Sequence, residues 1–179
     1  MRNLTLVIAV TGCLAVLGVA GCGSSSSTSS GAGTSTATST TSGKTHLATA
    51  KFLLHAGLAF GAFHQFIYKP IKAGDLKHPF EHKLTLIKAG LAAVFVYHEL
   101  KLAAQDAKNS KLLSPLVAPL TAAASKLSGL KDSITSGGVS PSSISSLSSS
   151  LDQIKSTAAS KGQSITESVP GLAQLTSGG

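Results

Sequence analysis

Cysteine is scarce in this chain of 179 residues, which contains only Cys13 and Cys22. The sequence after Cys22 therefore has no thiol for a disulfide, a nucleophile or a thiolate metal site. Its stability has to come from an ordinary apolar core.

Arginine and aromatic residues are also rare. Arg2 is the only arginine, tryptophan is absent, and aromatic residues make up 4% of the chain. Arginine suits bidentate phosphate and base-edge contacts, and stacked aromatic rings bind unpaired bases. We therefore expect no nucleic-acid partner, although the net charge is +8. A lysine-rich protein at a membrane would instead attract anionic lipid headgroups or anionic wall polymers.

Acidic residues number only seven. Asp75, Glu81, Glu99 and Asp106 are scattered and each lies near a lysine, which is typical of solvated helix faces. The serines of the C-terminal half have no G-x-S-x-G setting, and the sequence has no glycine-rich phosphate loop. We therefore expect that the protein is not an enzyme.

The N-terminus has the layout of a signal peptide, in which Arg2 precedes an apolar run from Leu4 to Ala20. The run ends in Val19-Ala20-Gly21-Cys22, which resembles the lipobox of bacterial lipoproteins. This resemblance implies cleavage between Gly21 and Cys22, a diacylglycerol on the Cys22 sulfur and a further acyl chain such as palmitate. Such chains hold a protein at the extracytoplasmic face of the cell membrane. An ordinary cleaved signal or an uncleaved membrane helix are the alternatives.

Residues 23–43 consist entirely of Gly, Ser, Thr and Ala. Without bulky apolar side chains this stretch cannot offset the entropy of ordering, so we expect a flexible, disordered linker with a reach of about 25 Å. It is similar to the linkers of lipoproteins from high-GC Gram-positive bacteria. The predicted organisation is a signal peptide (1–21), a lipidated cysteine with its linker (22–45), a helical domain (46–162) and a weakly structured tail (163–179).

Helical periodicity after residue 46 predicts an all-α fold, an up-down antiparallel bundle of about four helices. We expect Pro70 to end a first helix that begins near Leu47. A second helix should run from about Pro79 to Asn109. Its predicted core stripe is Leu84, Ile87, Leu91, Val94 or Phe95, His98 and Leu102.

The third and fourth helices are predicted to start at Ser114-Pro115 and Ser140-Pro141, with a break at Gly137-Gly138. The fourth has a regular apolar stripe of Ile144, Leu147, Leu151, Ile154 and Ala158. In the first helix pair, a turn near residues 73 and 74 would place Gly57 level with Gly90. Since each interior glycine costs about 1 kcal/mol relative to alanine, we expect a close helix crossing there.

A membrane-embedded hairpin is an alternative for the first two helices. Residues 52–68 are largely apolar, and Gly57 and Gly61 have the spacing of packed membrane helices. However, the second apolar stretch is short and contains Lys88, while His55 and His64 interrupt the first. A hairpin within a protein core is the simpler interpretation.

Histidine is the one chemically versatile residue type that recurs, and imidazole binds zinc, copper and haem iron. His55 and His64 are nine residues apart and fall on opposite faces of one helix. The remaining candidates for a metal or haem site are His46 with His98, and His78 with His82. Neither pair forms a convincing site.

We therefore expect a membrane-anchored extracytoplasmic protein with a non-catalytic structural, binding or interaction role in the cell envelope. Apart from the lipid on Cys22, no cofactor is expected. A helical metal or haem carrier and a membrane-embedded accessory protein are the alternatives.

Overall fold

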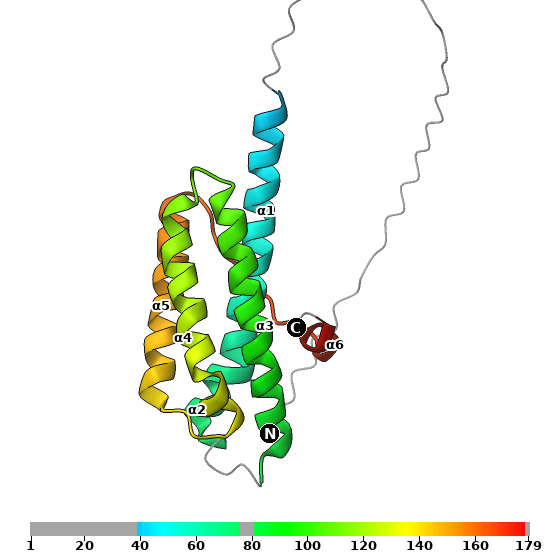
Figure 1. The fold of residues 1–179 in the computed structure, drawn as a ribbon, viewed down its shortest axis with the longest axis vertical. Helices are drawn as coiled ribbons and strands as arrows, with labels where there is room; N and C mark the ends of the chain where they lie inside the picture. The colour runs from blue at the N-terminus through cyan, green and yellow to red at the C-terminus, as the bar shows by residue number, and fades with distance from the viewer. Residues whose placement is uncertain (1–38, 76–80, 178–179) are drawn as a thin grey trace, which may run out of the picture. The chain divides into compact units, whose positions relative to one another are not determined.

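The computed structural model describes residues 39–75 and 81–177, in which every regular element is helical. The predicted signal peptide, Cys22, His78 and most of the predicted linker lie outside these ranges. Four long helices pack antiparallel, which confirms the predicted fold class (Figure 1). They are α1 (Ser39–Ala62), α3 (Lys83–Lys108), α4 (Val117–Thr135) and α5 (Pro141–Ser160). Four short elements complete the fold, namely the π-helix η1 (Phe63–Tyr68), α2 (Lys69–Ala73), the 3-10 helix η3 (Ser114–Leu116) and α6 (Leu172–Ser177).

The centre of the bundle is α3, which packs against α1 on one side and α4 on the other. Helix α5 lies against α4 and reaches η1 and α2 on its other side, so that it closes the bundle. The core extends from Ala48 to Leu175 within the compact unit Ala37–Gly179.

The buried face of α3 is built from small residues. Six of its buried residues are alanines, and Phe95, Val96 and Leu100 are the larger apolar ones. The predicted core stripe is therefore wrong along most of the helix, because Leu84, Ile87 and His98 are exposed; of the alternatives Val94 and Phe95, Phe95 is buried. A helix held between two neighbours at close range has room mainly for small side chains on its inner face, so several of its large apolar residues project outward.

Pro70 does not end the first helix, contrary to the prediction. The chain continues from α1 through η1 into α2, where Pro70 lies in the first turn. In η1 a backbone N–H donates to the carbonyl five residues earlier, where an α-helix would use the carbonyl four residues earlier. The Lys69 N–H, for example, donates to the His64 carbonyl. Because proline has no N–H to donate, it fits directly after this π-turn without breaking the helical path. The path ends at Gly74, which has a left-handed φ of 86°.

The later helix boundaries follow the sequence closely. Helix α3 ends at Lys108 with Asn109 as its cap, and Ser114-Pro115 opens η3 ahead of α4. Ser140 precedes α5 in extended conformation, with Pro141 in the first turn. All five residues of the predicted α5 stripe are buried, which confirms it.

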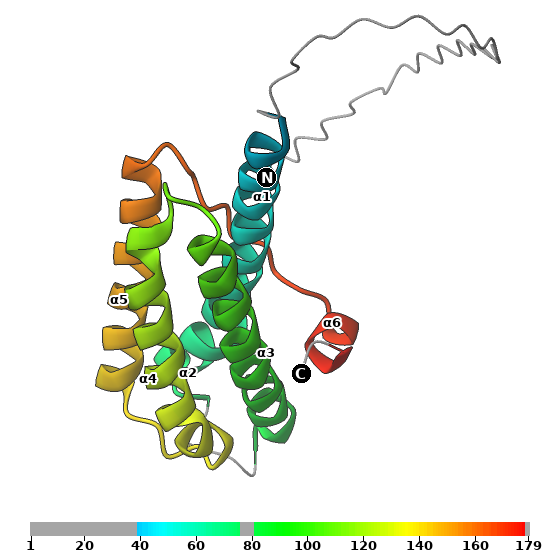
Figure 2. The ribbon, with the colours of Figure 1, turned by 45° about the horizontal axis from the view of Figure 1, so that its top comes forward.

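The C-terminal segment from Gln163 to Gly171 crosses α1 as an extended strap on its way to α6 (Figure 2). The Ser168 N–H donates to the Gly57 carbonyl at 3.0 Å, and Ile165 is buried in the core. A side chain at Gly57 would meet the Thr166 carbonyl, and one at Gly61 would meet the Ser168 backbone.

The predicted crossing of Gly57 with Gly90 is therefore wrong. Gly90 faces the Thr135 side chain of α4, and no Gly90 atom lies within 4 Å of the Cβ position of Gly57. The glycine spacing in α1 serves the strap and not the partner helix. Within residues 39–75 and 81–177, no helix combines the length and apolar character needed to cross a bilayer.

We predict that Gly57→Ala and Gly61→Ala each destabilise the protein by about 1–3 kcal/mol, because the added methyl group overlaps strap backbone that cannot easily move. Gly129→Ala in α4 is the control, because nothing lies within 4 Å of its Cβ position. It should stabilise by about 0.5–1 kcal/mol through helix propensity. Urea denaturation measures all three, and a gain in stability for Gly57→Ala would contradict the strap packing.

Candidate functional site

His55 joins α1 to α3 through partly buried contacts with carboxylates. Its Nδ1 lies 2.6 Å from Glu99 Oε2, and its Nε2 lies 3.8 Å from Asp106 Oδ2. The Glu99 side chain is only 8% exposed, so the prediction that this acid lies on a solvated helix face is wrong. The two carboxylates flank opposite ring nitrogens, so both nitrogens are engaged within the fold.

His64 takes part in a second cluster, which connects η1, the strap and α5. Its Nδ1 lies 2.7 Å from Glu167 Oε2, and Lys155 Nζ donates to Glu167 Oε1 at 2.7 Å. The π-turn also places the His64 ring against Tyr68, with 5.6 Å between ring centroids. His55 and His64 thus point to different neighbours, as their nine-residue spacing predicts.

Beside this second cluster is a small pocket of about 270 Å³. Gly61, Gln65, Lys69 and Val169 complete its lining with His64, Tyr68 and Glu167. Burial raises the pKa of Glu167, but hydrogen bonds from Lys155 and His64, together with their charges, outweigh burial and lower the pKa below its ordinary 4.5. The Glu167 carboxylate therefore holds the strap to two helices in its ionised form.

The candidate metal ligands do not converge. His46 and His98 are exposed, and His82 precedes α3 as its N-cap. His55 is the α1 residue that meets Glu99, the neighbour of His98, and His46 lies about 14 Å before it along the helix. Among the residues that the structure describes, no group of three histidine, aspartate or glutamate side chains could hold a metal ion.

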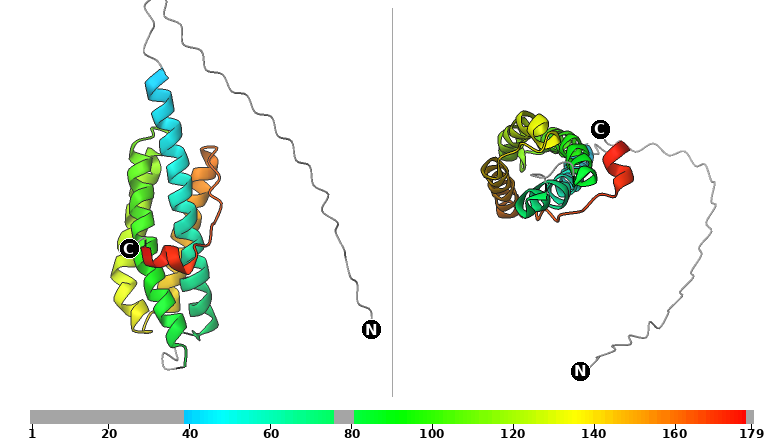
Figure 3. Two further views of the ribbon diagram at one scale, coloured as in Figure 1. Left: turned by 90° about the vertical axis from the view of Figure 1, so that its right-hand side faces the viewer. Right: turned by 90° about the horizontal axis from the view of Figure 1, so that it is seen from below.

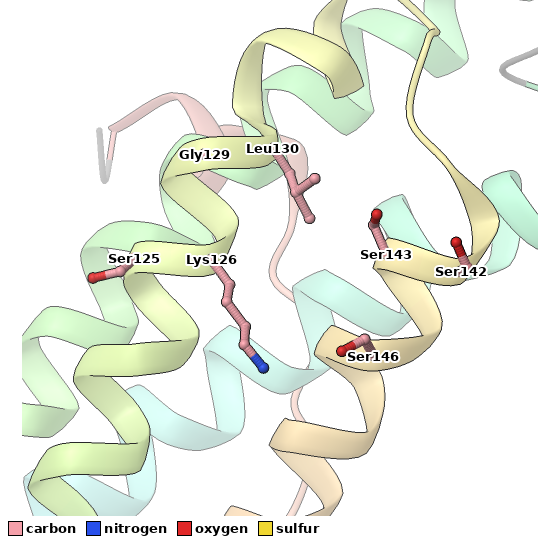
Figure 4. Close-up of a pocket in the computed structure, with 7 residues that line it drawn as sticks. All are labelled: Ser125, Lys126, Gly129, Leu130, Ser142, Ser143 and Ser146. Carbon is pink, nitrogen blue, oxygen red and sulfur yellow. The ribbon is translucent and has the colours of Figure 1, made fainter.

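A larger cleft of about 560 Å³ opens between α4 and α5 (Figure 4). Helix α5 contributes Ser142, Ser143 and Ser146, and α4 contributes Ser125, Lys126, Gly129 and Leu130. Figure 4 shows the Lys126 and Leu130 side chains directed toward α5, whereas the Ser125 hydroxyl points away from it. The cleft is thus lined by serine hydroxyls, the Lys126 ammonium and the apolar Leu130 side chain.

Lys126 also bonds to α5 just below this cleft, where its Nζ donates to Ser150 Oγ at 3.0 Å. A serine hydroxyl that accepts a bond from a lysine resembles an activated nucleophile. Both residues stand at the solvent-facing edge of the two helices, however, and the ammonium acts as donor. We interpret the contact as a cross-link between α4 and α5.

Sequence reasoning missed Glu99, Lys155 and Glu167 as partners of histidines. Glu99 and His55 are separated by 44 residues, and Glu167 and His64 by 103. The sequence contains a signal for the first pair only. If the alanine-rich face of α3 is taken as the buried one, Glu99 falls on that face and needs a polar partner. For the second pair, the path of the strap has to be known.

Comparison of the chain with protein-family models, with curated proteins and with solved structures finds no match.

We predict that His55→Ala destabilises the protein by about 3 kcal/mol, because it leaves the buried Glu99 carboxylate without its closest partner. The double variant His55→Leu/Glu99→Leu should recover most of the loss, since it removes both polar groups. His46→Ala, an exposed position on the same helix, should stay within about 0.5 kcal/mol of wild type. Urea denaturation tests the set, and equal effects of His55→Ala and His46→Ala would refute the role of the pair.

The lowered pKa of Glu167 predicts acid sensitivity. The unfolded chain binds a proton on Glu167 near pH 4.5 and the folded protein only at lower pH, so the stabilisation is present above pH 4.5 and disappears as pH falls through the folded-state pKa. Glu167→Gln should therefore lower stability by about 1–2 kcal/mol at pH 7 and flatten its decline below pH 4.5. Asp152→Asn, at an exposed site on α5, should keep the wild-type pH profile in the same denaturation experiment.

Proposed function

We propose that the protein is a lipid-anchored, extracytoplasmic binding module of a bacterial cell envelope without catalytic activity. The observation that carries this proposal is the order of three segments along the chain. Val19-Ala20-Gly21-Cys22 ends an apolar run, a linker of Gly, Ser, Thr and Ala follows, and a compact helical unit comes last. This arrangement suits a folded module held close to a membrane by acyl chains.

The two histidine clusters support a non-catalytic role. A general base needs a ring nitrogen that can reach a substrate. In this fold both nitrogens of His55 face carboxylates, and His64 Nδ1 contacts the strap carboxylate Glu167. These contacts join helices to each other and to the strap, so their chemistry serves the architecture.

The cleft between α4 and α5 supports a binding role. Its volume falls within the range of ordinary ligand sites, and it is lined by side chains from two helices. Serine hydroxyls and the Lys126 ammonium are groups that recognise polar ligands through hydrogen bonds.

We predict that Cys22 is the N-terminal, acylated residue of the mature protein. Cells fed an alkyne analogue of palmitate should label the wild-type protein, and mass spectrometry should find an N-terminal peptide that begins at Cys22. Cys22→Ser should abolish the label. Cys13→Ser is the matched control, because Cys13 lies within the predicted signal peptide and should leave labelling unchanged. Labelling that persists in Cys22→Ser would refute the anchor.

A further inference from the structure

The outward side of α3 carries large apolar side chains that remain exposed to solvent. Leu84, Ile87 and Val94 are 73%, 58% and 41% exposed, and Leu91 is half-buried. Their spacing of three and four residues places these four side chains on one side of the helix. We call them the α3 apolar face. A row of large exposed apolar side chains of this kind marks an interaction surface more often than a scattered single residue does.

Within α3, the exposed charged residues beside this face are all lysines, whereas Glu81, an exposed acid, lies two residues before the helix begins. Lys83 lies four residues before Ile87 and Lys101 lies seven residues after Val94, so both fall on the same side of α3. Every fully exposed residue of α3 is apolar, lysine, histidine or glutamine. The two acids of the helix, Glu99 and Asp106, are turned toward His55 and contribute no exposed carboxylate.

The neighbouring helices α1 and α6 also expose apolar side chains and lack acidic ones. Figure 3, left, looks onto α1 and α3 with α6 crossing in front of them. Neither α1 nor α6 contains an acidic residue. Helix α1 exposes Leu47, Lys51 and Leu54, and α6 exposes Leu172. The right-hand view in Figure 3 shows α5, with its many serines, on the opposite side of the bundle from α6.

We propose that the side formed by α1, α3 and α6 rests on the surface of a bilayer that contains anionic phospholipid. Apolar side chains enter the boundary between headgroups and acyl chains, while the lysines meet lipid phosphates, as in interfacial amphipathic helices. The charge pattern favours this occupant over a second copy of the chain, because pairing two such faces would bring lysines of like charge together. The inference rests on the proposed function only in that the anchor supplies the membrane.

The test uses residues 22–179 with Cys22→Ser, so that no acyl chain contributes; this chain retains the whole core, which lies between Ala48 and Leu175. Binding is measured by co-sedimentation with vesicles of phosphatidylcholine with or without phosphatidylglycerol. We expect binding to the vesicles that contain phosphatidylglycerol and little to the others. The triple variant Leu84→Ser/Ile87→Ser/Val94→Ser should bind at least tenfold more weakly, and Lys83→Gln and Lys101→Gln about fivefold each.

Matched controls lie outside this side of the molecule. Leu112→Ser removes an exposed leucine between α3 and η3, and Lys131→Gln removes an exposed lysine of α4. Both should bind like the parent, and circular dichroism should show equal helicity throughout. The proposal is overturned if the parent binds no better to vesicles that contain phosphatidylglycerol than to those without it. It is also overturned if the triple variant binds as well as the parent, or if the control variants lose as much binding as the triple variant. A parent that fails to bind vesicles and dimerises through Ile87 would assign the face to a second copy instead. Because acylation of Cys22 is measured separately in cells, failure here leaves the anchor proposal intact.

Discussion

Close approach of α3 to α1 and α4 governs the placement of the other side chains in this protein. Contact at short range requires small residues, and α3 presents alanines to both neighbours. Leu84, Ile87 and Val94 of the same helix are then directed to its outer side, although Phe95 and Leu100 remain buried. One packing constraint thus accounts for both the dense interior and the apolar exterior of α3.

The same constraint explains why the bundle contains carboxylates that are not on its surface. Once the alanine face of α3 is turned inward, Glu99 is carried in with it and needs a partner in a region poor in water. His55 provides that partner from α1. The contacts of His55 with Glu99 and Asp106 also favour one register of the two helices, because sliding by one turn would leave the buried Glu99 without its closest partner.

Much of the fold could be predicted from local patterns, and the exceptions have physical causes. The boundaries and the buried stripe of α5 follow from its caps and its regular spacing, because this helix contacts the core along one narrow face. For α3, close packing on two sides fills most of the inner face with alanines, so Leu84 and Ile87 lie outside even though Phe95 and Leu100 are buried. The prediction that Pro70 ends the first helix is wrong because the π-turn before it removes the backbone hydrogen bond that a proline would otherwise break. The site residues Glu167 and Lys155 could not be found, since their contacts depend on a strap whose path no helical periodicity reveals.

The strap also has a consequence for the order in which the chain can fold. Its binding groove consists of Gly57 and Gly61 on the first helix, but the segment that fills it is made only after all four long helices. During synthesis the groove therefore stays open until the strap has been made. The strap can pack against α1 only after Glu167 and Leu175 have been made. A chain without the strap would leave the two glycines of α1 uncovered and His64 without its Glu167 partner, so that chains with and without the strap differ in the surface they expose.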